Sequence, residues 1–511
     1  MRKLVTWRRI SQVAFLGLFV VLLIETRYTD GEKVRAGVDI FLRSSALNAL
    51  TAALSARSAS PVGLPAIVLV VVAVLLGRVF CGWICPLGTL LDGFRRVAVR
   101  RSVLGGDDPR AAAWAPARFV VLIAALAAAL LGANLAGWVD PLSLLTRAFS
   151  AVVFPVAAVV VHAAIVALSR PHSELLNGWS DSLNQHVAPV LGPPGAAQAA
   201  ATAVLLLAIF ALERIAPRAW CRFLCPLGAL YGLLGRFRLV RRRVGPECNQ
   251  CGACAKRCRS GALSDGEGRL TNSADCMLCG TCASICPKDA VSLFPATPPA
   301  APEMHSLRLS RRQLFGAVAG GAAGAALAGV SAAGPVAAPL RPPGSQDETD
   351  FLARCARCGE CVRVCATSGR GLQLAGTRDG WHALWTPVFS FRSGCCSHEC
   401  NLCGQICPTK AIPLLPLADK QRTVIGIARI DRSLCIPWYG SDECMVCEEV
   451  CPTPDKAVQF RDEEVVTAAG EKLPQRRPYI NESLCIGCGV CETRCPVPGE
   501  SAIQVRPARA R

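Results

Sequence analysis

Hydrophobic residues gather in five long runs within the first 212 positions of the chain, at about 10–26, 64–80, 119–139, 148–168 and 196–212. Each run is close to the ~20 residues that an α-helix needs to cross the hydrocarbon core of a bilayer. Beyond position 240, cysteine, glycine and proline interrupt short stretches of mixed polarity. The pattern predicts a helical membrane region followed by small, loop-rich domains.

Basic residues predict how these runs are oriented, because the cytoplasmic flanks of membrane helices are rich in arginine and lysine. Basic residues precede the first run, fill the loop after the second run and follow the fifth run. The three basic segments contain Arg2, Lys3, Arg8 and Arg9; Arg95, Arg96, Arg100, Arg101, Arg110 and Arg118; and Arg214, Arg218, Arg222, Arg236, Arg238 and Arg241–Arg243. We expect all three segments to lie in the cytoplasm.

An even number of crossings must then separate the second basic segment from the third, but three runs lie between them. Run 148–168 carries Pro155 and His162 and leads into a polar stretch, so we expect it to lie in the membrane plane or to re-enter on the outer side. The other four runs would then span the membrane. The alternative is a true fifth span at 148–168.

A further apolar run begins in the middle of the chain with SRRQLFGAVAGGAAGAALAGV, residues 310–330. Arg311 and Arg312, followed by the weakly apolar segment 314–338, resemble a twin-arginine export signal, which normally opens a polypeptide. We expect an internal signal-anchor that carries the following domain across the membrane. Cleavage near Ser331–Ala333 would release that domain, and a cytoplasmic linker is the alternative.

Composition agrees with a membrane protein of several domains. The 511 residues are 52% hydrophobic and only 18% charged, which indicates that part of the chain lies in lipid. The formal net charge of +18 would also suit a nucleic-acid-binding protein. Because many of the arginines flank apolar runs, we predict basic membrane flanks and no nucleic-acid partner.

The 29 cysteines carry the strongest chemical signal. Four runs have the spacing C-x2-C-x2-C-x3-C, and two more are looser versions of it. Three thiolates at this spacing hold three corners of a [4Fe–4S] cubane, while the fourth ligates a neighbouring cluster. Zinc also takes four thiolates, but its sites usually consist of two separated C-x2-C pairs. We therefore predict about six [4Fe–4S] clusters.

The predicted cluster ligands form six groups in chain order. They are Cys248, Cys251, Cys254 and Cys258; Cys276, Cys279, Cys282 and Cys286; Cys355, Cys358, Cys361 and Cys365; Cys396 (or Cys395), Cys400, Cys403 and Cys407; Cys435, Cys444, Cys447 and Cys451; and Cys485, Cys488, Cys491 and Cys495. In the first two groups, the crossing of the fourth cysteine predicts that Cys286 joins the first cluster and Cys258 joins the second.

Four further cysteines lie in a repeated C-x3-C-P-L-G motif directly after the second and fifth apolar runs. The two copies read CGWICPLGTL, with Cys81 and Cys85, and CRFLCPLGAL, with Cys221 and Cys225. Thiols at i and i+4 share one face of a helix, so the two pairs can converge as a metal site or a dithiol couple. The alternative is that all four are small buried hydrophobic residues.

The C-x3-C-P pairs after membrane helices, followed by two cysteine runs, resemble the NapH family of membrane quinol dehydrogenase subunits and the related NosR, MauN and CcoG proteins. The stretch WVDPLSLLTR, residues 138–147, is similar to a segment of that family after the third helix. From about 305 onward, the chain resembles the exported NapG/MauM-type ferredoxins. It therefore looks like a fusion of the two types, in which 148–195 looks like an insertion and the CCSHEC run departs from the usual spacing.

The resemblance to multi-cluster ferredoxins implies that the last four cysteine runs nest, the first with the fourth and the second with the third. The expected sets are Cys355, Cys358, Cys361 and Cys495; Cys485, Cys488, Cys491 and Cys365; Cys396 (or Cys395), Cys400, Cys403 and Cys451; and Cys435, Cys444, Cys447 and Cys407.

The family resemblance also implies a function. Quinol is the expected electron donor, oxidised near the outer face around Asp140 and Pro141, and a periplasmic cytochrome or reductase is the expected acceptor. An ionisable residue at membrane depth is a functional candidate, so Asp140 either accepts a quinol proton or caps a helix on the outer loop. The alternative function is a NosR- or CcoG-like maturation or regulatory factor that reduces a metal such as copper for another enzyme.

Together these expectations describe an α-helical membrane bundle, with about four spans and an internal signal-anchor helix, that carries α+β ferredoxin-like domains. The expected boundaries are 1–240 for the membrane domain and 241–300 for a cytoplasmic two-cluster ferredoxin. Residues 301–345 would form the signal and linker, and residues 346–511 a periplasmic four-cluster domain. The expected location is the bacterial inner (cytoplasmic) membrane, with several passes.

Overall fold

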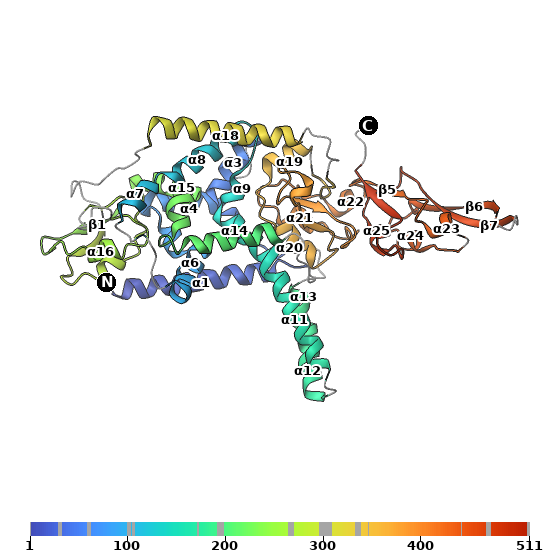
Figure 1. Ribbon diagram of the computed structural model, residues 1–511, viewed down its shortest axis with the longest axis horizontal. Coiled ribbons are helices and arrows are strands. Elements are labelled where there is room, and N and C mark those ends of the chain that lie inside the picture. Colours follow the sequence, from blue (N-terminus) through green and yellow to red (C-terminus); the bar gives the residue numbers. More distant parts are fainter. Residues whose placement is uncertain are drawn as a thin grey trace.

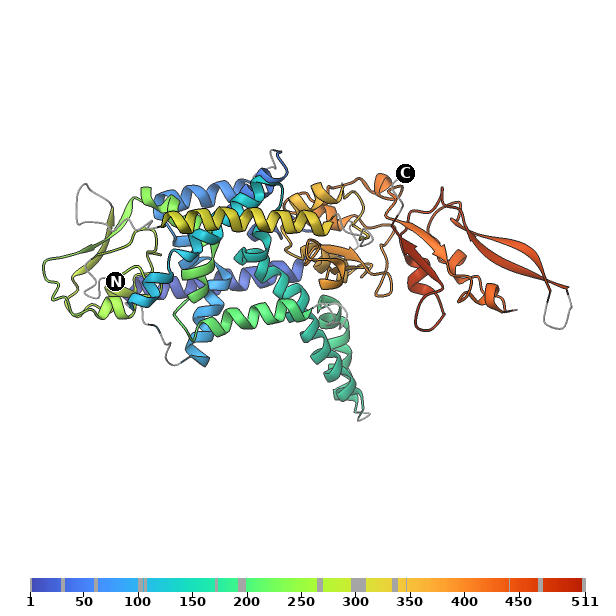
Figure 2. The same ribbon diagram turned by 45° about the horizontal axis from the view of Figure 1, so that its top comes forward.

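A bundle of helices forms the middle of the molecule, and a cysteine-rich part lies at each end of it (Figure 1). One end contains residues 240–295 and lies beside the N-terminus, and residues 347–507 form the opposite end (Figure 2). The computed structural model describes residues 2–28, 33–58, 63–99, 104, 108–170, 173–191, 199–263, 270–295, 309–332, 339–345, 347–440, 442–466 and 472–507.

The helices before residue 240 belong to the bundle and to an arm that leaves it. They are α1 (Arg2–Glu25), α2 (Ile40–Arg43), α3 (Ala46–Ser55), α4 (Leu64–Leu76), α5 (Val79–Trp83), α6 (Pro86–Ala98), α7 (Pro109–Trp114), α8 (Ala117–Leu130), α9 (Ala136–Val139), α10 (Pro141–Ala148), α11 (Phe154–Ser169), α12 (Glu174–Ser182), α13 (Ala188–Leu191), α14 (Ala199–Leu212) and α15 (Pro226–Leu234). A π-helical turn, Phe149–Val153, joins α10 to α11, and another, Trp220–Leu224, precedes α15.

Three of the predicted spans form shorter helices than their apolar runs suggest. Helices α4, α8 and α14 have 13, 14 and 14 residues, or about 20 Å at 1.5 Å per residue. Gly77 directly follows α4 with a φ of 69°, and Gly132 follows α8 with a φ of 89°. Glycine adopts this left-handed backbone readily, so it ends the helix before the apolar run is complete. Residues 196–198 of the fifth run, and Arg100 and Arg101, lie outside the described residues.

Within the described residues, two helical stretches are long and apolar enough to cross a membrane, Lys3–Glu25 and Pro141–Ser169. The second includes run 148–168, for which we predicted no crossing. Helix continues through Pro155, the second residue of α11, which directly follows the π-helical turn Phe149–Val153. The helix lengths in the described residues therefore do not support the four full-length spans that the sequence predicts.

Helices α11 and α12 form an arm that projects sideways from the bundle, across the direction of α1 (Figure 1). The two helices pack together, and the Ser180 hydroxyl donates to the Ile165 carbonyl at 3.3 Å. Much of the α11 surface is apolar and exposed, with Val156, Val159 and Val160 each at least half exposed. A helix that is apolar on all sides needs lipid or protein around it.

Helix α18 (Arg311–Ala332) runs along the bundle from the 240–295 end towards the 347–507 end (Figures 1 and 2). The Ser310 side chain accepts from the Gln313 amide, and the Gln313 side chain accepts from the Ser310 amide. This capping box starts the helix at the arginine pair. The helix packs on α8 with small residues, since a Cβ on Gly321 would lie 2.9 Å from the Ala127 Cβ. Segment 333–338 lies outside the described residues.

Each cysteine-rich end is built on short antiparallel strand pairs. In the 240–295 end, β1 (Val240–Val244) pairs with β2 (Val291–Pro295) and encloses α16 (Ala253–Lys256) and α17 (Thr281–Ser284). In the other end, β5 (Ile427–Ile430) pairs with β8 (Ile503–Arg506). The remaining elements there are α19 (Glu348–Arg354), α20 (Glu360–Ala366), β3 (Leu372–Leu374), β4 (Pro387–Phe389), α21 (Leu402–Ile406), α22 (Leu417–Lys420), α23 (Ile436–Tyr439), α24 (Val446–Glu449), the hairpin β6 (Val458–Val466) and β7 (Lys472–Ile480), and α25 (Val490–Arg494).

Replacing each of two neighbouring glycines of α18 by alanine should change the stability of the protein in opposite directions. Gly321→Ala should lower the thermal stability of the protein, because its Cβ would collide with the Ala124 carbonyl oxygen and force α18 away from α8. Gly320→Ala should raise stability by up to about 1 kcal/mol, because alanine favours helix and nothing lies within 4 Å of its Cβ. Thermal unfolding of both variants in the same detergent tests this, and equal shifts would contradict the packing of α18 on α8.

Candidate functional site

The four regular cysteine runs share one backbone conformation. In each run, the residue two places after the first cysteine and the residue directly after the second cysteine have positive φ angles. These pairs are Gln250 and Gly252, Leu278 and Gly280, Arg357 and Gly359, and Gly487 and Gly489, with φ between 48° and 78°. Left-handed residues within a tight loop turn successive amide N–H groups inward, forming a concavity that binds anions, including iron–sulfur clusters. The loops therefore fit a [4Fe–4S] cluster with thiolate ligands.

In the 240–295 end, thiols from different runs come together. Burial raises the pKa of Cys258, and the nearby thiols of Cys279 and Cys276 raise it further. Burial raises the pKa of Cys282 to about 12. The nearby thiols of Cys276, Cys279 and Cys258 contribute in the same direction. This grouping of Cys258 with the second run agrees with the predicted crossing. That these thiols bind iron stays a prediction.

In the other end, the nested pairing of the last four runs is wrong. Burial and the charge of nearby Cys407 raise the pKa of both Cys355 and Cys358, so Cys407 replaces the expected Cys495 in that set. Similarly, burial raises the pKa of Cys365, and the nearby thiol of Cys400 raises it further. The run beginning at Cys355 therefore pairs with the next run along the chain.

The last two runs form a second pair around two small cavities. Cys435, Cys444, Cys447 and Cys495 line one cavity. Cys451, Cys485, Cys488 and Cys491 line the other. Within the described residues, no three His, Cys, Asp or Glu side chains are grouped as a site for a single metal ion.

The strand pairing gives the physical reason for this correction. The β5–β8 pair closes 427–506 as one unit, just as β1–β2 closes 240–295. Neighbouring runs then meet within each unit, and short connections between sequential elements are the usual arrangement. The 347–507 end is therefore two consecutive two-run units, and no set is shared between its first and last runs.

The structure also separates the two candidates in the CCSHEC stretch. Burial raises the pKa of Cys396, and the nearby thiols of Cys365 and Cys400 raise it further. The Cys395 side chain lies near Arg494 and Lys420, with no cysteine among its charged neighbours. Cys396 is thus the member of the set, and Cys395 is the cysteine left over.

The two C-x3-C-P pairs converge, as the sequence predicts. Cys81, Cys85, Cys221 and Cys225 are only 4–8% exposed. Burial raises the pKa of Cys85, and the thiols of Cys81 and Cys221 raise it further. Burial also raises the pKa of Cys225, and the thiols of Cys221 and Cys81 raise it further. We call this group the four-thiol site, and a metal in it stays a prediction.

Buried arginines surround the four-thiol site, and the sequence did not predict their burial. Arg78 and Arg218 are each 1% exposed, and two carboxylates compensate them. Arg218 donates to both oxygens of Asp92, at 2.8 and 3.0 Å. Asp275, from the 240–295 end, forms ion pairs with Arg78 at 3.4 Å and with Arg118. The signal was present, since each motif extends upstream to R-x2-C-x3-C-P-L-G.

Asp140 is fully buried and caps α10. Its carboxylate accepts from the Ser143 amide at 2.9 Å, the Ser45 hydroxyl at 2.8 Å and the Asn48 amide at 3.0 Å. Of its two predicted roles, helix capping is confirmed, although the residue is buried and not on an exposed loop. Its role as a proton acceptor stays a prediction.

The bundle meets the 347–507 end through two further buried arginines. Arg147 donates to the Arg357 carbonyl at 2.8 Å and its guanidinium lies 4.0 Å from the Trp385 ring centre. Arg357 donates to the Asn134 carbonyl. The loop that holds Cys355 and Cys358 is therefore fixed directly on the end of the bundle that contains Asp140.

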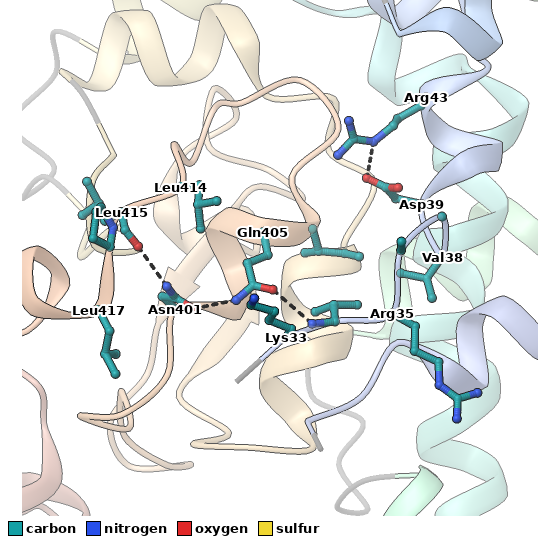
Figure 3. A pocket seen from close by; sticks show the side chains of 15 residues that line it. Lys33, Arg35, Val38, Asp39, Arg43, Asn401, Gln405, Leu414, Leu415 and Leu417 are labelled. Atoms are coloured by element: carbon teal, nitrogen blue, oxygen red, sulfur yellow. Dashed lines mark hydrogen bonds and ion pairs between the residues drawn. The ribbon is translucent and has the colours of Figure 1, made fainter. Parts of the chain in front are cut away.

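A cavity of about 540 Å³ lies where the 33–43 segment meets the 347–507 end (Figure 3). The Val34 amide donates to the Gln405 side chain at 3.0 Å, and Gln405 donates to Asn401 at 2.7 Å. Apolar side chains of Leu414 and Leu415 complete the wall. Gln405 lies on α21 between Cys403 and Cys407, which belong to two different thiol sets, although no cysteine lines the cavity itself.

Comparison with protein families supports the iron–sulfur assignment. Residues 61–104 and 198–247 match a family described as a 4Fe-4S binding domain, and residues 442–498 match a 4Fe-4S dicluster domain. The only cysteines in the first two matched segments are those of the four-thiol site. No solved structure matches the chain.

Three characterised relatives represent the two types of similarity. The chain is 31% identical over 214 residues to the methylamine utilization ferredoxin-type protein MauN of Paracoccus denitrificans, covering 40% of this chain and only 58% of that protein. It is 26% identical to the ferredoxin-type protein NapH of Haemophilus influenzae, over 49% of this chain and 73% of that protein. It is 37% identical to the MauM protein of Methylorubrum extorquens, over 33% of this chain and 72% of that protein.

Removing the shared carboxylate should loosen the contact between the bundle and the 240–295 end. Asp275→Asn leaves Arg78 and Arg118 buried without a counter-charge, which typically costs about 3–5 kcal/mol. Chemical unfolding should show that loss, and limited proteolysis should cut the 240–295 end sooner. Asp289→Asn changes an exposed carboxylate in the same end and should be nearly neutral. Equal stability of the two variants would contradict the role of Asp275.

Proposed function

This chain belongs to the family of NapH- and MauN-type ferredoxins, [4Fe–4S] electron-transfer proteins, and we propose that it passes electrons from membrane quinol to a periplasmic acceptor. The observation that carries the proposal is the cavity lined by Gln405 and Ile406 of α21, the helix that also carries Cys403 and is directly followed by Cys407. Periplasmic cytochromes and reductases are the acceptor class.

The arrangement of the chain supports opposite locations for its two cysteine-rich ends. The basic segments lie towards the 240–295 end, which supports a cytoplasmic location for that end. Helix α18 then leads from the cytoplasmic side to the 347–507 end (Figure 1). In this orientation α1, α4, α8, α14 and α18 lie along the membrane normal. The arm of α11 and α12 lies across it near the outer face, as an in-plane element.

The cavity beside α21 has the composition of a quinol site. Ligand sites combine a mostly apolar wall with a few convergent polar groups, and usually measure about 300–1,000 Å³. Here Leu414 and Leu415 supply apolar wall. The polar groups available to the two quinol hydroxyls are Gln405 and the Asp39 carboxylate, which also forms an ion pair with Arg43 (Figure 3). The cavity volume of about 540 Å³ lies within this range, and residues 33–39, which follow α1 in the chain, form one of its walls.

Oxidation of quinol to quinone releases two electrons and two protons. [4Fe–4S] clusters take up electrons one at a time. A quinol in this cavity would therefore deliver its two electrons to the two sets that contain Cys403 and Cys407. The protons would leave through the Asp39 carboxylate and the open mouth of the cavity, towards the periplasm. Asp140 does not line this cavity, so we assign it to helix capping.

The alternative of a copper-reducing maturation factor receives less support. A thiol site that receives a cuprous or cupric ion must be open to the ion. The four-thiol site is at most 8% exposed and lies among buried guanidinium groups, which repel a cation.

Blocking the cavity should slow quinol oxidation. Leu414 is 58% exposed in the cavity wall, so Leu414→Trp can fill the cavity without disturbing the core. We expect about tenfold slower reduction of the clusters by a water-soluble quinol analogue at a fixed low concentration, mainly through a higher KM. Anaerobic stopped-flow absorbance of the purified protein measures this rate.

Val424→Trp is the matched control, because Val424 is 52% exposed in the same end and does not line the cavity. Dithionite should reduce the unmodified protein, Leu414→Trp and Val424→Trp equally. This control excludes damage to the clusters. If quinol fails to reduce any cluster of the unmodified protein, or if Leu414→Trp reacts at the unmodified rate, the cavity is not the site of quinol oxidation.

A further inference from the structure

Arg8 lies on the face of α1 that packs against the second cysteine run of the 240–295 end. Leu4 covers Gly280, the residue directly after Cys279, and a Cβ added to Gly280 would lie 2.8 Å from the Leu4 side chain. Arg8 follows Leu4 by four residues, so the two side chains share one face of α1. The Cys279 thiol is among the groups that act electrostatically on the Arg8 guanidinium. Helix α1 therefore brings a positive charge to the Cys279 loop.

The Arg8 guanidinium is enclosed and lacks an acceptor. Arg8 is 0% exposed, and none of its three guanidinium nitrogens has a hydrogen-bond partner among the residues that the structure describes. The Asp92 carboxylate lies 4.0 Å away, which is beyond hydrogen-bonding distance. A buried donor without an acceptor is costly, and more so when it is charged. A group that accepts hydrogen bonds from Arg8 is therefore expected at this position.

Asp92 does not fill this role, because other donors already occupy its oxygens. Arg218 donates to both of them, at 2.8 and 3.0 Å. Arg259 forms an ion pair with Asp92 at 2.8 Å, and the Gln12 side chain donates to it at 3.1 Å. Three guanidinium groups, those of Arg8, Arg218 and Arg259, thus share one carboxylate, which leaves two positive charges uncompensated. Buried charge of this kind is strongly unfavourable unless something balances it.

A cluster in the adjoining cysteine set would supply both the acceptor and the balancing charge. We call this set, whose thiols come together in the structure, the inner set; it consists of Cys258, Cys276, Cys279 and Cys282. The sulfur atoms of a [4Fe–4S] cluster accept hydrogen bonds, and the core with its four thiolates carries net negative charge. The unpaired Arg8 nitrogens therefore fit such a cluster.

We propose that Arg8 donates hydrogen bonds to sulfur atoms of the cluster in the inner set and raises the reduction potential of that cluster. Reduction adds one electron, and so one negative charge, with no bond made or broken. A guanidinium group beside the cluster stabilises the reduced form more than the oxidised form. The inference deepens the proposed electron-transfer function, and only the part that this potential plays in electron transfer rests on it.

The inner set is also the one that adjoins the bundle. The sulfur of Met277, between Cys276 and Cys279, lies 3.2 Å from the Arg218 guanidinium. In the first run of the same end, Cys251 is exposed. An electron that passes through the bundle would therefore meet the cluster of the inner set, where a raised potential favours its uptake.

A redox titration of the full-length protein in detergent tests the effect of Arg8. Dithionite and soluble mediators set the potential under anaerobic conditions, and EPR spectra follow the reduced clusters. Arg8→Gln should make reduction of one cluster about tenfold less favourable, which lowers its midpoint potential by about 59 mV. Cys279→Ser, which removes a ligand, identifies the EPR component of the inner set. Arg9→Gln removes a neighbouring charge that is exposed, and should leave every potential unchanged.

The proposal fails if the cluster of the inner set keeps its potential in Arg8→Gln, or if Arg9→Gln shifts it equally. A purely structural role of Arg8 would lower thermal stability without moving the potential. If Arg8→Gln does not fold, Arg8→Lys decides. Lysine keeps a charge but loses the planar fork of donors, so its potential should fall by a smaller amount, and an unchanged potential overturns the proposal.

The iron content separates the remaining outcomes. If Cys279→Ser keeps all of its iron, the inner set holds no cluster and the role of Arg8 is excluded. Because the titration contains no quinol, a protein in which Arg8 shifts the potential but quinol reduces no cluster would overturn only the proposed function.

Discussion

The buried ion pairs that Asp275 forms with Arg78 and Arg118 are the interaction on which the rest of the structure depends. A guanidinium group enclosed by apolar helices costs several kcal/mol unless a carboxylate compensates it. For Arg78 the compensating carboxylate comes from the 240–295 end, outside the bundle. The bundle and this end are therefore coupled in stability. Their coupling also fixes the Cys276 loop beside the four-thiol site.

The opposite end of the bundle is fixed by hydrogen bonds to carbonyl groups instead of by ion pairs. Arg147 and Arg357 donate across the junction, and each guanidinium also lies against a tryptophan ring. The bundle therefore separates two different contacts: a charge-balanced one with the 240–295 end and a carbonyl-based one with the 347–507 end. Each contact places a cysteine loop directly against the helices. This arrangement is compatible with the electron transfer through the bundle that we propose.

The sequence predicts the local chemistry well, because cysteine spacing and glycine position determine the shape of each loop. Gly252, Gly280, Gly359 and Gly489 occupy the same position in four runs and take the same left-handed conformation. The convergence of Cys81 with Cys221 also follows from the repeat. The pairing of the last four runs does not, because it depends on which strands meet, here β5 with β8. The nested arrangement rests on family resemblance alone, which does not determine which strands pair.

Helix lengths and the burial of charged residues are harder to predict from the sequence. Gly77 and Gly132 end α4 and α8 inside apolar runs, and hydropathy alone does not register that. The arginines assigned to cytoplasmic flanks include Arg8, Arg118 and Arg218, which are fully buried in the structure. Their partners, Asp92 and Asp275, are 183 residues apart in the sequence, so only the folded chain brings them together.

The central claim is that electrons pass through the bundle between the two cysteine-rich ends, and its most direct test uses sealed, quinone-free proteoliposomes. A membrane-impermeant reductant such as dithionite is added outside, and Mössbauer spectroscopy of iron-57-labelled protein counts the reduced clusters. The account predicts that clusters of both ends become reduced from one side, to the extent seen after detergent is added. Reduction of only the clusters at the exposed end, with the rest reduced only after detergent, would contradict it.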